Sequence, residues 1–597
     1  MKKLTLAILI AILFVCFSGS AQEKQIADRL NGFDQYMEKI LNDWNAPGIG
    51  VGIVYKDKLV FAKGYGYRDF DKKLPITPNT LFQIASNTKL FTATAVGLLV
   101  NEKKLEWDQP VKNYVPSIQF YNNELNNTVT MRDMLAHRTG ISRHDLIWYK
   151  SDFTRKQLFD KLKFLEPSQP IRQGFIYNNL MYCASGQVIE ILTQKTWEDF
   201  VKEKIFMPLE MTSSCFTISD MLKQSDYFVP FNEKRDTTIL YQIPYYEDQS
   251  AVGPAGAIIS NINDLSKWLI AQMNKGKFNG KQVIPEEVIN ETLTPAIAND
   301  NSASLNKGYF ELLSPTYGMA RNIASYRGHL ITYHGGDING IHSQVSFMPT
   351  DSIGVIVFTI GDHTYPLYNT VTFNIYERLL GMNQTPWSER RLEDRIKGKT
   401  VDKEGRSKAG LDKVENTKPS HAIEDYAGVF EHPAYGDLNI SLKEEQLFFD
   451  FHKIILPLNH YHYDRFDTPD DENEGKWSVN YLTNPQGEID KLAISVDESE
   501  VIFTRKPDLK MIDPSFLAKY TGSYEQAGQV FKLSLNEDNK LTVVIPGQPV
   551  YELVPVKLDK FKLKQFSDVV IQFTSEKEAI TGFDLSQPSG VYHFSKK

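Results

Sequence analysis

A run of apolar residues from Leu90 to Val100, preceded by Ser86 and Lys89, most limits what this chain can fold into. A helix over this run would be apolar nearly all round, so it belongs inside a large core rather than on a surface. Ser86 and Lys89 are three positions apart, which places them on one face of a helix. The first turn of a helix also offers unpaired backbone N–H groups to a developing negative charge. The segment therefore predicts a buried central helix with a serine and a lysine side by side at its start.

Two interpretations of Ser86 remain open on this segment alone. Serine is a preferred N-cap residue, so Ser86 can simply begin the helix. Alternatively, a desolvated Lys89 with a lowered pKa can take the proton of the Ser86 hydroxyl and make that oxygen a nucleophile. The spacing by itself does not decide, because Ser304 and Lys307 repeat it in a polar stretch with no apolar helix behind it.

The amino-terminal residues 1–21 predict a secretory signal peptide, in which two lysines precede a short apolar stretch and small residues follow. The mature protein is thus expected in the periplasm or outside the cell, with no stable membrane span. A formal net charge of −8 argues against a nucleic-acid partner. The mature chain keeps only Cys183 and Cys215, which favours two buried thiols over a pair and excludes a disulfide framework. No zinc-type Cys/His spacing occurs, so no metal is expected.

Composition divides the mature chain into four parts. Residues 22–383 begin with a hairpin over residues 48–69, continue through helices and end in further strands. This order predicts an α+β domain, an antiparallel sheet flanked by helices. Residues 384–420 are charged and poor in aromatics, which predicts a linker that is partly helical. Residues 421–508 and 509–597 alternate in the manner of strands and predict two small all-β domains.

An internal repeat supports the division of the β region into two. The sequence YAGVFE beginning at Tyr426 returns as YTGSYE beginning at Tyr520, and alternating strands follow each copy. Two small antiparallel barrels fit this repeat better than one large sheet.

A second candidate element lies in FIYNNLMYCASGQVIEIL, where Tyr177 and Asn179 stand at the entrance of an apolar helix. A serine nucleophile needs a group that protonates the leaving group. Beside a cationic lysine the Tyr177 phenol is favoured as a phenolate, which could relay the proton. Taken alone, Tyr177 is better explained as a half-buried packing residue.

A third candidate element lies in ITYHGGDING, where a strand ends at His334. Gly336 has no side chain, so the backbone can come close to a bound ligand. The N–H of Asp337 could then join that of Ser86 in holding an oxyanion. A turn at the end of a strand explains the two glycines as well.

Taken together, the runs SNTK, YNN and HGG resemble the three motifs of the class C beta-lactamase-like serine hydrolases, in the penicillin-binding-protein superfamily. The resemblance covers about residues 25–383 and includes LFQIASNTKLFTA and VTMRDMLAHRTGI. It implies a beta-lactamase/DD-peptidase-like domain of the peptidase S12 type, with Ser86 as the acylated nucleophile, Lys89 as its general base and Tyr177 in proton transfer. The two barrels resemble the lipocalin-like domains appended to some of these enzymes.

The same resemblance assigns Asn179, His334, Gly336 and Asp337 to substrate binding. His334 departs from the family pattern, because lactamases carry lysine there and a neutral imidazole is a poorer partner for a carboxylate. Efficient lactam hydrolysis is therefore not expected.

The function expected from the resemblance is an exported serine hydrolase that works through an acyl-enzyme without a cofactor. Its substrates would be small peptides or amides of the D-amino-acid type, cell-wall fragments among them, or esters. A beta-lactamase, a penicillin-binding sensor that acylates without turnover and a binding protein stay open as alternatives, as does the oligomeric state.

Overall fold

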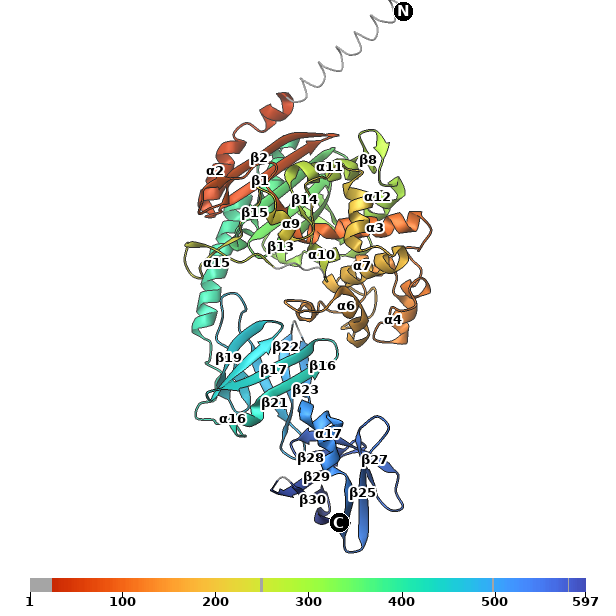
Figure 1. Ribbon diagram of the computed structural model, residues 1–597. Helices are drawn as coiled ribbons and strands as arrows, with labels where there is room; N and C mark the ends of the chain where they lie inside the picture. Colours follow the sequence, from red (N-terminus) through yellow and green to blue (C-terminus); the bar gives the residue numbers. More distant parts are fainter. Residues whose placement is uncertain (1–23, 247–250, 497–498, 578) are drawn as a thin grey trace, which may run out of the picture. The chain divides into compact units, whose positions relative to one another are not determined.

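The computed structural model describes residues 24–246, 251–496, 499–577 and 579–597, so the predicted signal peptide lies outside the described residues. The described chain divides into two compact units (Figure 1). The first contains residues up to Trp148 and Asp152–Ala409, and the second contains Tyr149–Ser151 and Gly410–Lys597. Over the described ranges, no helix combines the length and the apolar character needed to cross a membrane.

A nine-stranded sheet with antiparallel neighbours forms the centre of the first unit. Its strands come from both ends of the unit's sequence, because β1 pairs with β15 along its whole length. This arrangement confirms the predicted α+β class and antiparallel sheet. In spatial order the strands are β10 (Ile297–Ala298), β11 (Leu312–Tyr317), β12 (Asn322–Tyr326), β13 (His329–Ile338), β14 (Ile341–Met348), β15 (Ile353–Ile360), β1 (Gly48–Tyr55), β2 (Lys58–Asp69) and β3 (Leu74–Pro75).

Helices cover the sheet (Figure 1). They also form much of the sequence between β3 and β10. The longer ones are α2 (Phe33–Asp43), α3 (Thr88–Asn101), α7 (Asn179–Thr193), α11 (Ile262–Met273), α14 (Leu367–Leu380) and α15 (Trp387–Ser407). The shorter ones in this unit are α4 (Asn123–Thr128), α5 (Met131–Leu135), α6 (Arg155–Lys161), α8 (Trp197–Val201), α9 (Ile218–Leu222), α10 (Gly253–Gly256), α12 (Glu286–Thr292) and α13 (Ser302–Asn306). Three two-stranded sheets join β4 (Phe82–Gln83) to β7 (Ile259–Ser260), β5 (Phe231–Glu233) to β6 (Leu240–Gln242) and β8 (Lys277–Phe278) to β9 (Lys281–Gln282).

The sequence of β1, GIGVGIVY, shows why helices pack on both faces of the sheet. Successive side chains of a strand point to opposite faces. Ile49, Val51 and Ile53 join one core cluster with residues of α2 and α14. On the other face, a Cβ at Gly52 would lie 2.6 Å from Ile262 of α11, so only glycine permits this approach. The alternation of glycine with branched residues thus sets α11 close to the sheet.

The apolar helix predicted from residue 90 onward is α3, and it lies in the core as expected. Phe91, Val96 and Leu99 are fully buried. The Phe91 ring stacks on that of Trp268 with centroids 3.9 Å apart. Burial on all sides holds the first turn of α3, and the serine before it, in a fixed place.

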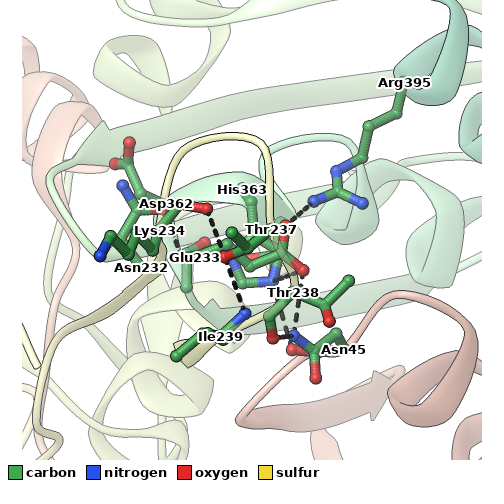
Figure 2. A network of polar contacts seen from close by, with 12 residues as sticks. Asn45, Asn232, Glu233, Lys234, Thr237, Thr238, Ile239, Asp362, His363 and Arg395 are labelled. Carbon is green, nitrogen blue, oxygen red and sulfur yellow. Dashed lines mark hydrogen bonds and ion pairs between the residues drawn. The ribbon is translucent and has the colours of Figure 1, made fainter. Parts of the chain in front are cut away.

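The charged segment predicted as a linker contains α15, and this helix packs on the first unit. Trp387 and Ser388 at its start are buried, and the Trp44 indole donates to the Ser388 hydroxyl at 2.9 Å. Arg395 further along α15 pairs with the buried Glu233 (Figure 2). Lys399 on the same helix also pairs with Glu233.

Two closed eight-stranded antiparallel barrels make up the rest of the described chain, as predicted (Figure 1). Barrel 1 follows α16 (Ile423–Tyr426) and contains β16 (Gly428–His432), β17 (Gly436–Lys443), β18 (Gln446–Phe451), β19 (Ile454–His462), β20 (Arg465–Asp467), β21 (Ser478–Thr483), β22 (Ile489–Val496) and β23 (Ser499–Arg505). Barrel 2 follows α17 (Pro514–Leu517) and contains β24 (Gly522–Gln526), β25 (Gln529–Leu535), β26 (Leu541–Val544), β27 (Val550–Lys557), β28 (Lys560–Leu563), β29 (Phe566–Glu576), β30 (Ala579–Gln587) and β31 (Gly590–Lys596).

The internal repeat extends to matching side-chain contacts in the two barrels. The buried Tyr426 donates its hydroxyl hydrogen to Asp464, and the buried Tyr520 donates to Asp559. Each tyrosine thus ties the segment before the first strand to a turn between later strands.

Candidate active site

Ser86 lies in a tight turn that three separate segments hold in place. The turn is the 3₁₀ helix η1 (Ala85–Asn87), directly after β4. The Ile84 N–H donates to Ile258 O at 2.9 Å, which fixes the entry to the turn. Ala85 has a φ of +47°, a left-handed conformation that costs energy for a residue with a Cβ. Strain directly before Ser86 is of the kind that accumulates at functional sites.

Strand β14 also contacts the turn that carries Ser86. The Ser343 hydroxyl donates to Ile84 O at 2.8 Å and accepts from the Asn87 side-chain amide at 2.9 Å. Gly336 on β13 lies so close that a Cβ there would be 2.1 Å from Ile84 O. The glycine predicted to allow a close approach to a ligand therefore allows the close approach of the Ser86 turn to the sheet.

Lys89 meets Ser86 inside the protein. Its side chain is fully buried, with Nζ 3.0 Å from Ser86 Oγ and 2.8 Å from Ala255 O, to which it donates. Burial holds the pKa of the Lys89 amine well below its usual range. The N-cap of α3 is Asn87, so Ser86 is not the cap residue of this helix, and its hydroxyl lies beside the Lys89 amine.

Tyr177 is the third member of this group. Its phenol lies near the Ser86 hydroxyl, and Lys89 Nζ lies 4.8 Å from the centroid of its ring. Burial raises the pKa of the Tyr177 phenol above its usual value, although the nearby Ser86 hydroxyl lowers it. This differs from the expected phenolate, because desolvation of the buried phenol disfavours its charged form. Tyr177 is a neutral proton donor in this arrangement.

Two residues that the sequence analysis did not select position Tyr177. Asn178 caps α7 by accepting from the Met181 N–H at 3.2 Å, and its own N–H donates to His137 Nδ1 at 3.0 Å. The His137 ring is buried, with its centroid 4.3 Å from that of Tyr177. Burial keeps the pKa of His137 well below its usual value, so its ring is neutral. An asparagine before an apolar helix is the signal that could have identified the cap.

The Asn179 side chain faces the charged pair of Asp145 and Arg143. Its side-chain amide donates to Asp145 at 3.1 Å, and Asp145 also accepts from Arg143 at 2.8 Å. The Arg143 guanidinium lies 5.3 Å from the Tyr177 ring centroid. The pair lies in the sequence SRHDLIW. Two opposite charges shortly after the end of a helix were the signal that could have identified this pair. The substrate role of Asn179 remains a prediction.

His334 has both ring nitrogens engaged within the protein. Nε2 lies 3.0 Å from the Tyr317 hydroxyl, and Nδ1 lies 2.5 Å from Gly335 O. Burial and the neighbouring Lys89 lower the pKa of His334 to about 3, so it is a neutral ring at ordinary pH. His334 therefore lacks the fixed charge of the lysine in the family pattern.

Asp337 follows on the same strand and is partly exposed. Its carboxylate lies 2.8 Å from His342 Nδ1, and these two residues face each other across β13 and β14. We predict that the Asp337 N–H holds an oxyanion. We also predict that Gly336 and His334 contact the substrate. Cys183 and Cys215 are not joined by a disulfide in the part of the chain that the structure describes.

Sequence comparison places this site within a known family. The family model described as "Beta-lactamase" matches residues 33–378. The chain belongs to the beta-lactamase family. A second model, described as a domain of unknown function (DUF3471), matches residues 412–505.

Comparisons with individual proteins agree with this family assignment. An unguisins hydrolase of Aspergillus campestris is 27% identical over 445 residues, which are 69% of this chain and 78% of that one. A Staphylococcus aureus protein named flp is 26% identical over 339 residues, 55% of this chain and 63% of that one. The octameric penicillin-binding protein homologue from Pyrococcus abyssi has a TM-score of 0.52 at 20% identity and covers 79% of this chain and 99% of its own. The protein is thus a serine hydrolase of the beta-lactamase-related family with a penicillin-binding-protein-like fold.

Proposed function

We propose that this protein is an exported hydrolase that forms an ester on Ser86 with a small peptide or amide of the D-amino-acid type, or with a small ester. The observation that carries the proposal is the 3.0 Å separation of Ser86 Oγ from the buried Lys89 amine. A neutral amine at this distance can accept the serine proton. A relative named as a hydrolase supports turnover, and the apolar residues after Lys2 and Lys3 support export.

The reaction would proceed in two halves. As Oγ of Ser86 bonds to the substrate carbonyl carbon, Lys89 takes the hydroxyl proton and the carbonyl electron pair moves to oxygen. The N–H groups of Ser86 and Asp337 would hold this oxyanion. Tyr177 would protonate the leaving amine or alcohol and regain a proton from Lys89. Water then attacks the ester, with the same groups acting in reverse.

Substrate choice follows from the charges around the site. His334 is neutral, so a substrate carboxylate would find no fixed positive charge there. The proposal therefore favours amides and esters over beta-lactams, whose recognition in this family depends on a lysine at that position.

The test is the mass of the intact protein after exposure to a fluorophosphonate, for the wild type, Ser86→Ala and Ser304→Ala. One adduct that disappears only in Ser86→Ala is expected. An adduct that persists in Ser86→Ala would reject Ser86 as the nucleophile.

Turnover needs a separate measurement with D-amino-acid amides, p-nitrophenyl esters and a penicillin. Release of many product equivalents from an amide or ester is expected. An ester on Ser86 that forms with penicillin and is never released, with no turnover of the others, would replace the hydrolase by a penicillin-binding sensor. Amino-terminal sequencing of the protein from its native host tests export, since an intact residue 1 would contradict it.

A further inference from the structure

Barrel 2 contains a cavity of about 750 Å³ at the end where β24 turns into β25. This volume lies in the range that small-molecule sites commonly have. Each described side chain that lines it is uncharged. A cavity of this size without a charge differs from the mixed surface of the rest of the barrel, where lysines and acids form ion pairs.

The floor of the cavity is apolar and well packed. Phe531, Val543, Ile571 and Phe594 line it, and all four are buried. Below them the barrel is filled, since the Phe531 ring lies 4.4 Å from that of Phe594, with Phe583 packed beneath at 4.9 Å from Phe594. The cavity is therefore a cup with a solid base, closed toward the barrel interior.

The rim of the cup carries amides. Gln526, Gln529, Gln548 and Gln587 all line it. A glutamine side chain both donates and accepts hydrogen bonds but has no charge. The rim can thus hold a hydroxyl or an amide of a ligand whose body lies on the apolar floor.

The corresponding hairpin of barrel 1 has a different loop. Its first hairpin has a three-residue loop, in which Tyr435 is buried against Phe503 with ring centroids 6.1 Å apart. In barrel 2 the first hairpin closes through two residues only, Ala527 and Gly528, both at positive φ. The shorter turn of barrel 2 has no aromatic side chain to place over the end of the barrel. The first hairpins of the two barrels therefore differ in loop length and in whether an aromatic side chain lies in the loop.

We propose that the cup of barrel 2 binds a neutral amphiphile, with an apolar chain on the floor and one uncharged polar group at the glutamine rim. A charged head group would lose hydration without finding an opposite charge in the lining, which disfavours fatty acids and alkylamines. An aliphatic alcohol has the required chemistry.

The test uses the full-length protein and the neutral dye Nile red. Saturable dye binding is expected, with displacement by dodecan-1-ol. Dodecanoate and dodecylammonium have the same chain, and the charge should weaken their displacement at least about tenfold. Absence of saturable binding, or equal displacement by the three compounds, would overturn the proposal.

Two variants with the same replacement locate the site. Val569 on β29 lines the cup, whereas Val591 on β31 is 67% exposed and does not. Val569→Trp should fill the cup and weaken dye binding about tenfold, while Val591→Trp should bind as the wild type does. Equal effects of the two variants would place the dye elsewhere and reject the cup.

A third variant tests the site even if Val569→Trp does not fold. Gln529 is exposed at the rim, so Gln529→Glu should leave the fold intact. A carboxylate at the rim should shift preference from dodecan-1-ol toward dodecylammonium, and an unchanged preference would contradict a head group at the rim. Fluorophosphonate labelling of Ser86 should not change in these variants, so this test is separate from that of the hydrolase.

Discussion

Lys89 is the residue at which folding and chemistry conflict most directly. Burying an amine in an apolar core costs free energy, and the cost appears as the lowered pKa of Lys89. The same lowering of the pKa makes the amine easier to deprotonate, as a general base requires. The site thus keeps a group that stability alone would not favour.

Replacing Lys89 with an apolar residue of similar length should separate these two effects. Lys89→Met should raise the free energy of unfolding by about 1–3 kcal/mol, because no amine remains to be desolvated. It should also lower the rate of Ser86 acylation by several orders of magnitude, about 10³-fold or more. Urea denaturation and fluorophosphonate labelling measure the two quantities. Ser86→Ala is the control, since it also abolishes labelling but keeps the buried amine. A Lys89→Met protein less stable than Ser86→Ala would contradict this account.

The pH dependence of acylation should report the same group. Only neutral Lys89 can accept the Ser86 proton, so the labelling rate should rise with pH through the lowered pKa of Lys89. The sign for stability agrees: below the ordinary lysine pKa the unfolded chain binds a proton that the folded chain resists, so stability increases with pH in that window. His334, with a pKa of about 3, should contribute no limb near neutrality. His334→Asn should therefore keep the same midpoint, and a shifted midpoint would show that the histidine titrates in this range.

Gly336 should be intolerant of even one methyl group. A Cβ there would meet the backbone oxygen of Ile84 at 2.1 Å, and backbone cannot move aside without displacing the turn that carries Ser86. Gly336→Ala should lower both the labelling rate and the melting temperature. Gly398→Ala on α15 is the control, because nothing lies within 4 Å of its Cβ position and alanine favours a helix. Equal behaviour of the two variants would mean that the turn is not clamped by β13.

At the scale of elements, the sequence predicted which segments meet but not how they are held. The helix after Lys89 and a strand at His334 were both predicted, but the predicted strand end was wrong, because β13 continues through Gly336 to Ile338 in its pairing with β14. The Ser343 clamp could not be predicted, because a serine within a strand gives no sign of the carbonyl group across the fold to which it donates. The neutral state of Tyr177 was missed for a related reason: the depth of burial is set by several chain segments together, and a motif shows only one of them.

The packing of α15 on the first unit could not be predicted from the sequence either. The segment is charged throughout, which is typical of a linker, yet its cations meet an acid more than 150 positions earlier. Glu233 is 6% exposed and accepts from Asn45 at 3.0 Å and from Lys399 at 2.6 Å, while Arg395 also pairs with it (Figure 2). The pattern of charges along a helix does not say which of them will find a buried partner.

Neutralising Glu233 should release this helix. Although burial raises the pKa of Glu233, hydrogen bonds from Lys399 and Asn45 hold it below its usual value. Its stabilisation is thus present above the ordinary glutamate pKa and lost as pH falls through the lowered one. Glu233→Gln leaves the cation of Arg395 without its carboxylate and should cost about 3–5 kcal/mol.

The exposed pair Glu393–Lys397 on the same helix provides the control for Glu233. Its side chains are 66% and 69% exposed, so Glu393→Gln should change stability by less than about 1 kcal/mol. Urea denaturation at pH 7 measures both variants. If Glu233→Gln lowers the free energy of unfolding no more than Glu393→Gln does, the contacts of α15 with Glu233 do not stabilise the fold.

At the scale of the whole molecule, the repeat in the sequence was the most reliable guide. YAGVFE and YTGSYE predicted two barrels, and the matching Tyr426–Asp464 and Tyr520–Asp559 contacts show why the pattern is visible. The tyrosine, glycine and aromatic positions of each copy occupy equivalent places in their barrels. The first hairpin differs between the copies, because its loop has three residues in barrel 1 and two in barrel 2. Loop length carries no periodicity, so the cup of barrel 2 could not have been predicted from the repeat.

The two compact units should unfold as separate cooperative transitions. Each has its own core, so a change in one core should move one transition only. Lys89→Met acts in the first unit and should raise the melting temperature of its transition. Tyr520→Phe acts in the second, where it removes the hydrogen bond to Asp559 and should lower the other transition by about 1 kcal/mol in free energy. Scanning calorimetry of the full chain and of both variants measures these shifts. A single transition that both substitutions move would mean that the units unfold as one, and the gain expected for Lys89→Met would then have to appear in the stability of the barrels as well.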